Sequence, residues 1–147
     1  ELIGQNFTDA KYFHGRPSAT SAPDPADTTK TVDAPYNAAN SSGSNLGPTS
    51  QKLIDRVKGD IEHIRADGVQ GPVAADSVTT SASGLDPHIS PANAYSQVAR
   101  VSKSWGLTED VVKSLVTAQI EGRTLGIFGE PRVNVLGLNL ALDALKP

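Results

Sequence analysis

Residues 18–49 constrain the fold more than any other stretch, because they are rich in Ser, Thr, Ala, Asn, Asp and Pro and carry few large apolar side chains. Val32, Tyr36 and Leu46 are the exceptions. A segment of this composition cannot bury enough apolar surface to fold on its own, and such a long irregular segment is more often functional or partner-ordered than idle. We therefore expect a long Ser/Ala/Pro-rich loop draped over the domain, with a helical turn near Pro35.

The hydrophobic core must then come from the flanking segments, which show helical periodicity. Thr49 or Ser50 is the predicted N-cap of a first helix that ends at Gly68. Its apolar residues fall on one helical face: Leu53, Ile54, Val57, Ile61 and Ile64. Because the chain has one Trp, three Tyr and three Phe, this core must consist mainly of Val, Leu, Ile and Ala.

Three more helices are predicted towards the C-terminus. Ser90 caps the first, which has Pro91 at its first position, ends at Gly106 and shares one face among Tyr95, Val98, Ala99, Ser102 and Trp105. Thr108 caps the second, which ends at Gly122. The third runs from Pro131 or Val133 to Leu145 and is apolar nearly all round, as expected of a central core helix or one that faces a partner.

Two short segments favour β-structure. Val78–Thr80 is β-prone, and Leu125, Ile127 and Phe128 lie between glycines in a connector that could form a strand paired with it. The sequence therefore predicts one α+β domain over residues 1–147, dominated by helices and completed by a small sheet.

Charge and composition exclude several functional classes. A net charge of −3 and a pI near 5.5 provide no basic surface for nucleic acid. Without cysteine there is no disulfide, thiolate or zinc-knuckle chemistry. His14, His63 and His88 show no metal-ligand spacing, so we expect neither a metal site nor a cofactor.

No apolar run is long enough to cross a bilayer. The chain opens at Glu1 and contains no Met, so we expect that an anchor or signal upstream has been removed from this sequence.

Asp86 and His88, with Ser83 or Ser90 nearby, are the residue types of a hydrolytic triad, but no nucleophile elbow accompanies them. Asp-Pro sequences are typical of turns, so a turn and a helix cap are the favoured interpretation. Two glycine-containing segments, at Gly43 and Gly84, lack the Lys-Ser or Lys-Thr ending of a phosphate loop. We predict no catalytic residue.

Five stretches of the sequence carry a family resemblance. They are Leu2–Phe7 with Tyr12–Ala19, Ser42–Leu46, Val78–Pro91, Gln97–Val101, and Pro131–Val135 with Asn139–Asp143. In order and spacing they resemble the blocks of the KdpC family, the accessory subunits of the bacterial Kdp potassium-transporting P-type ATPase. Family members carry one N-terminal transmembrane helix before the Leu-Ile-Gly-Gln block, on which this chain opens directly.

The resemblance implies a non-catalytic subunit in the cell membrane, with this domain on the extracytoplasmic side. Its implied partners are a channel-like K+-binding subunit and a P-type ATPase subunit. It would stabilise their complex, support ATP-driven K+ uptake and raise the affinity of the catalytic subunit for ATP. The candidate partner-binding residues are Tyr12, Phe13, Arg16, Asn45, Leu85, Asp86, His88, Arg132 and Asn134.

Several of these candidates could instead have a purely structural role, and two other functions remain possible. Tyr12 and Phe13 are equally suited to filling the domain's own core. Arg132 is expected to pair with an internal carboxylate such as Asp86. An extracytoplasmic solute-binding module is the main alternative function, and it requires an enclosed polar pocket; a small hydrolase requires Asp86, His88 and a Ser within hydrogen-bond reach.

Overall fold

The computed structural model describes residues 2–145. Its helices are α1 (Gln51–Ala66), α2 (Pro91–Ser96), α3 (Val98–Trp105), α4 (Glu109–Ala118) and α5 (Val135–Asp143), with a 3-10 turn at Ala75–Ser77. Its strands are β1 (Ser21–Pro23), β2 (Thr31–Asp33), β3 (His88–Ile89), β4 (Ile120–Glu121) and β5 (Arg132–Asn134). The predicted helix-dominated α+β fold is confirmed.

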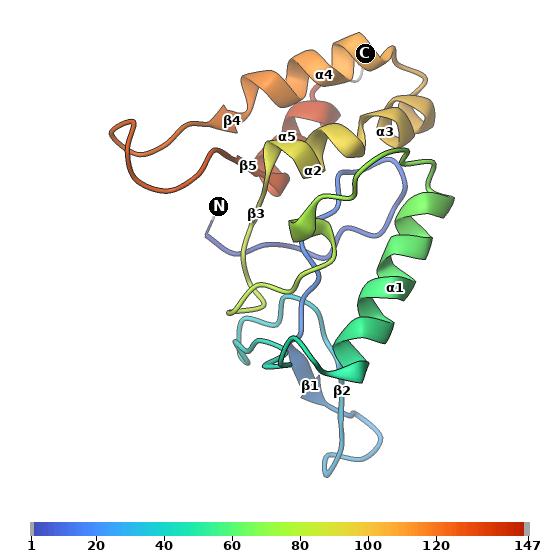
Figure 1. Ribbon diagram of the computed structural model, residues 1–147, viewed down its shortest axis with the longest axis vertical. Coiled ribbons are helices and arrows are strands. Elements are labelled where there is room, and N and C mark those ends of the chain that lie inside the picture. Colours follow the sequence, from blue (N-terminus) through green and yellow to red (C-terminus); the bar gives the residue numbers. More distant parts are fainter. Residues whose placement is uncertain (1, 146–147) are drawn as a thin grey trace.

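The core lies where α2, α3, α4 and α5 pack together beside an antiparallel sheet of order β3-β5-β4 (Figure 1). It is aliphatic, as the shortage of aromatic residues predicted, and Phe13 joins it from the N-terminal segment. Its buried members are Phe13, Ile89, Ala94, Val98, Val101, Val112, Val116, Val133, Val135, Leu138 and Leu142.

The predicted caps of the second helical segment are confirmed. The Ser90 side chain accepts a hydrogen bond from the Asn93 N–H at 3.1 Å, and Gly106 ends α3 in the left-handed conformation. The single helix predicted there is wrong, since it is interrupted at Gln97. The buried face is also rotated from the predicted one, because Tyr95 is 39% exposed while Asn93 and Val101 are buried.

The predicted strand pairing is wrong. Val78–Thr80 follows the 3-10 turn and forms no strand, although Val78 itself is buried. β5 pairs instead with β3 and β4, and Leu125–Phe128 form the tip of the β4–β5 hairpin. Because this hairpin uses residues on both sides, α4 ends before Gly122 and α5 begins only at Val135.

Residues 18–49 are mostly loop, as predicted, but the antiparallel hairpin β1–β2 lies within them. The helical turn predicted near Pro35 is wrong: Asn37 N–H donates to the Ala34 carbonyl at 3.2 Å in a tight turn where Tyr36 has a positive φ of 61°. The Tyr36 hydroxyl donates to the Arg16 carbonyl at 2.7 Å. This contact ties the long loop to the N-terminal segment.

α1 confirms the helix predicted between Ser50 and Gly68, and it runs along the side of the molecule apart from α4 and α5 (Figure 1). None of its residues is fully buried, and Ile54 is 38% exposed. Within residues 2–145, no helix combines the length and apolar character needed to cross a bilayer.

Candidate partner-binding site

Four of the predicted partner-binding residues meet at one shallow cavity. Arg16 comes from the N-terminal segment, Asp86 from the turn before β3, His88 from β3 itself and Arg132 from β5, and together they line a depression of about 640 Å³. The antiparallel pairing of β3 with β5 brings the last two segments together, since His88 lies opposite Asn134. The fold therefore unites residues that are far apart in sequence.

The charges of this cavity are held by internal partners. Arg16 Nη1 donates to Asp86 at 3.1 Å and its Nη2 donates to the Thr80 carbonyl at 3.2 Å. Asp86 also accepts from the His88 N–H at 3.0 Å, which confirms the predicted turn role. Arg132 does have an internal carboxylate partner, but that partner is Glu121 across the β4–β5 pair, at 3.0 Å, and the prediction of Asp86 is wrong.

The hydrolase alternative fails on its serines. His88 Nδ1 lies 3.5 Å from Asp86, which would be two parts of a triad. However, the Ser90 hydroxyl donates to Asp76 at 2.8 Å and caps α2, and the Ser83 hydroxyl accepts from the Leu85 N–H at 3.2 Å. No hydrogen bond among the described residues joins a serine hydroxyl to the His88 ring, so no triad is assembled.

The two aromatic candidates are used inside the domain. Phe13 has no exposed surface and belongs to the core, which is the alternative role predicted for it. Tyr12 is half-buried, its hydroxyl donates to the Asp143 carboxylate at 3.1 Å, and its ring packs near Phe7 and Trp105.

The remaining candidates, Asn45, Leu85 and Asn134, make hydrogen bonds with backbone groups of the domain. Asn45 has a positive φ of 50° and its side chain donates to the Gly43 carbonyl at 3.2 Å. Leu85 is half-buried and its carbonyl accepts from the Gly4 N–H at 2.9 Å. Asn134 caps α5 by accepting from the Gly137 N–H at 3.0 Å.

A second depression, not predicted from the sequence, lies beside α1. It has a volume of about 380 Å³, and its lining includes His14, Tyr36, Asp67, Gln97 and Arg100. The Arg100 side chain is only 9% exposed, and its guanidinium donates to the Tyr12 carbonyl at 3.0 Å and to Gln97 at 2.7 Å. The Gln97–Val101 stretch contributed to the family resemblance, but its residues carried no predicted role.

The electrostatics of this cleft follow from burial. Burial lowers the pKa of His14, and the positive charge of Arg100 lowers it further. Burial likewise lowers the pKa of Arg100, against the opposing effect of the Asp67 carboxylate. In the part of the chain that the structure describes, no cluster of His, Asp or Glu is suited to hold a metal ion.

Comparison with known proteins gives a consistent result. The family model described as KdpC, K+-transporting ATPase, c chain, matches residues 1–144. The potassium-transporting ATPase KdpC subunit of Methylobacterium nodulans is 64% identical over 144 residues, which cover 98% of this chain and 72% of that protein. Subunits of the same name are 66% identical in Rhodopseudomonas palustris, over 97% of this chain and 71% of the relative, and 64% identical in Bradyrhizobium diazoefficiens, over the same shares.

Proposed function

The chain belongs to the KdpC family of K+-transporting ATPase subunits, and from this premise we propose that it is a non-catalytic accessory subunit. It assembles and stabilises a potassium-transporting P-type ATPase complex and supports ATP-driven K+ uptake. The family match across residues 1–144 is the observation that carries the proposal.

The partners in this proposal are a channel-like K+-binding subunit and a P-type ATPase subunit. One N-terminal helix anchors the full-length protein in the cell membrane, and the domain described above lies on the extracytoplasmic side. This arrangement rests on the family resemblance.

The chemistry of the shallow cavity that Arg16, Asp86, His88 and Arg132 line, called the shared cavity below, supports an accessory role. A general acid or base must be free to exchange a proton with a substrate. Arg16 and Asp86 instead bind each other, and Arg132 binds Glu121. Such internally satisfied pairs hold segments in place, as a scaffold for contact with other subunits requires.

We also propose that the subunit raises the affinity of the catalytic subunit for ATP. A domain outside the cytoplasm can affect a cytoplasmic site only by binding one conformation of the pump more tightly than another. The effect on ATP affinity is therefore a consequence of docking, so variants that weaken binding to the pump must also weaken the effect on ATP affinity.

The test is K+-stimulated ATP hydrolysis by the other purified subunits, measured with and without the full-length accessory subunit across a range of ATP concentrations. We expect addition to raise activity and to lower the KM for ATP. Unchanged activity, together with failure of the subunit to co-purify with the others, would overturn the accessory role. Restored activity at an unchanged KM would overturn only the effect on ATP affinity.

The cleft beside α1 is the observation that favours the second candidate, an extracytoplasmic solute-binding module. Its volume of about 380 Å³ falls in the range of small-molecule sites, and such sites combine apolar walls with a few polar groups. A solute that binds only the folded chain would raise its Tm, by an amount that grows with the ratio of solute concentration to Kd. Thermal unfolding with and without K+, amino acids and sugars tests this candidate, and an unchanged Tm with all of them rejects it.

A further inference from the structure

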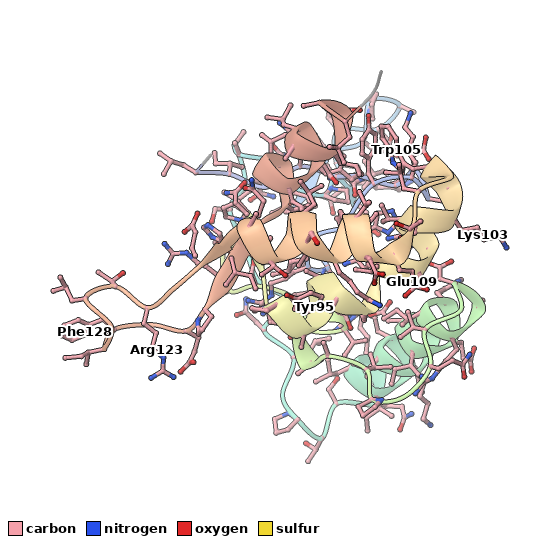
Figure 2. The ribbon with its side chains drawn as sticks, turned by 90° about the horizontal axis from the view of Figure 1, so that it is seen from above. Tyr95, Lys103, Trp105, Glu109, Arg123 and Phe128 are labelled. Carbon is pink, nitrogen blue, oxygen red and sulfur yellow. The ribbon has the colours of Figure 1, made fainter. Side chains whose placement is uncertain are left out.

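The β4–β5 hairpin forms an arm, residues 120–134, that projects from the body of the molecule (Figures 1 and 2). Its base is anchored, because Val133 is fully buried and pairs with Ile120. Phe128 and Arg123 lie far out on the arm, directed away from the helices (Figure 2). The arm therefore offers its outer end to solvent or to another molecule.

The end of the arm is strongly apolar. Leu125, Ile127 and Phe128, which we call the arm tip, are 83%, 72% and 64% exposed. Exposed apolar residues are ordinary when scattered singly, but a contiguous group of large ones marks an interaction site. Hydrogen bonds between Thr124 and Phe128, at 2.9 and 3.0 Å, hold the tip in one conformation.

The backbone at the tip provides an independent indication. Leu125 and Gly126 have positive φ angles of 54° and 72°, and the Ile127 N–H donates to the Thr124 carbonyl at 3.2 Å. Positive φ at both central residues is the geometry of a type I′ turn, which favours Asn, Asp or Gly at the first of them. Leucine is disfavoured there both by the backbone and by its exposure. Neither folding nor solubility explains this residue, whereas contact with a partner does.

The charges of the arm indicate what kind of partner it meets. Arg123 binds Glu130 at 2.7 Å and Arg132 binds Glu121 at 3.0 Å, so the four charges along the arm neutralise one another. Membrane-binding segments instead combine apolar residues with unpaired Lys or Arg, or with interfacial Trp and Tyr. The arm has neither, which favours a protein surface over a lipid surface.

The size of the tip argues against a second copy of this chain. A stable interface buries roughly 800 Å² per partner, more than three side chains at the end of a hairpin provide. A small apolar group is effective when it fills a preformed pocket as an anchor. We infer that the arm tip docks into an apolar pocket on the extracytoplasmic surface of another subunit of the ATPase, an inference that rests on the proposed function.

Leu125→Asn is the decisive variant, because a structural role and a docking role predict opposite results. Asparagine suits the turn, so the Tm of the variant chain should equal or exceed that of the wild type. Its affinity for the remaining subunits in detergent, titrated as the full-length protein, should fall at least about tenfold. Phe128→Ser should act in the same direction, while Val111→Asn, which alters an apolar residue on α4 that is 44% exposed, should leave affinity unchanged.

The outcomes are distinguishable. Undiminished affinity of both arm variants overturns the inference while leaving the accessory role intact. If the wild-type subunit does not bind the other subunits at all, the proposed function itself fails. If the arm variants keep their affinity for the subunits but no longer bind lipid vesicles, the tip contacts a membrane. If they keep that affinity but no longer form a dimer, the tip contacts a second copy of the chain. Either result would overturn the inferred contact with another subunit. The loss of affinity caused by Leu125→Asn should be nearly the same at low and high ionic strength, because the arm carries no unpaired charge; a loss that disappears at high salt would overturn the apolar contact inferred for the tip.

Discussion

The contact between Tyr36 and Gly15 provides a sharp test of how the long loop is held. A Cβ added to Gly15 would collide with the Tyr36 hydroxyl oxygen, whereas the ring carbon that bears this hydroxyl would lie 3.3 Å away. We expect Gly15→Ala to lower the free energy of unfolding by roughly 1–3 kcal/mol, the usual cost of overpacking. Tyr36→Phe alone should cost about 0.5–1.5 kcal/mol, because it removes the hydrogen bond to the Arg16 carbonyl.

The double variant is more informative than either single one. Once the hydroxyl is absent, the alanine methyl group meets only the ring, so Gly15→Ala combined with Tyr36→Phe should be about as stable as Tyr36→Phe alone. The coupling between the two positions should therefore be roughly 1–3 kcal/mol in the favourable direction. Urea unfolding of the four proteins, followed by circular dichroism, measures it.

Gly4 supplies a matched control for the same ring. A Cβ at Gly4 would collide with ring carbons of Tyr36 and would lie 2.9 Å from the Asp86 carbonyl oxygen. Removing the hydroxyl relieves neither contact, so Tyr36→Phe should not rescue Gly4→Ala. Additive costs for Gly15→Ala and Tyr36→Phe, or equal rescue at both glycines, would refute the contact geometry.

Three further predictions follow from buried polar groups. Asn139→Ala should lower the free energy of unfolding by about 2–4 kcal/mol, because Asn139 is 1% exposed and pairs with both the N–H and the carbonyl of Phe13 at 2.9 and 3.0 Å. Asn6→Ala, at an exposed position, should stay within about 0.5 kcal/mol of wild type in the same urea titration. Similar values for the two variants would contradict the prediction. Folding lowers the pKa of His14 from its ordinary value of 6.5, so the unfolded chain takes up a proton at a higher pH than the folded chain. The stability that depends on His14 should therefore be full above pH 6.5 and decline as the pH falls below it, and His14→Gln should flatten this decline in urea titrations over the same pH range. An equal decline in the variant would count against burial of the neutral imidazole. Burial raises the pKa of Tyr36 to about 12, with the Asp86 carboxylate adding to the effect, so the phenolate absorbance that Tyr36→Phe abolishes should develop only near that pH; its appearance near an ordinary tyrosine pKa would show that the ring is not buried.

Local sequence signals predicted the helices. The predicted strands were wrong, because strand pairing depends on residues that are far apart in sequence. Ser90 and Gly106 act on their own turn of the chain, and their outcomes match the sequence pattern. The helical periodicity of residues 53–64 likewise predicted α1, although none of its apolar residues is fully buried in the core. β3 and β5 each have too few residues to show alternation, and their pairing joins positions that are far apart in sequence. Val78–Thr80 was β-prone by composition, yet its context is a 3-10 turn. Intrinsic strand preference is overridden by tertiary context in this way.

The candidate site was predictable only as far as its residues carried a family resemblance. The resemblance selected Arg16, Asp86, His88 and Arg132, which the fold brings to one cavity. It did not indicate which acid pairs with which base, because that depends on the register of β5 between its two neighbours. The arm tip was visible as an apolar group between glycines, but a strand buried in the sheet explained it equally well until the structure placed it at the end of a hairpin.

Buried amides explain how so aliphatic a core fixes the position of the N-terminal segment. Apolar contacts are non-directional, so they alone do not specify which backbone groups meet. Asn139 pairs with the backbone of Phe13, and Gln97 accepts from the His14 N–H at 2.8 Å and donates to its carbonyl at 3.1 Å. Two consecutive residues are thus each bound at both backbone groups, as two neighbouring strands, one on each side of the segment, would bind them. α5 and the residue between α2 and α3 thereby fix the course of the segment that carries Arg16 into the shared cavity, which links the core directly to the candidate site.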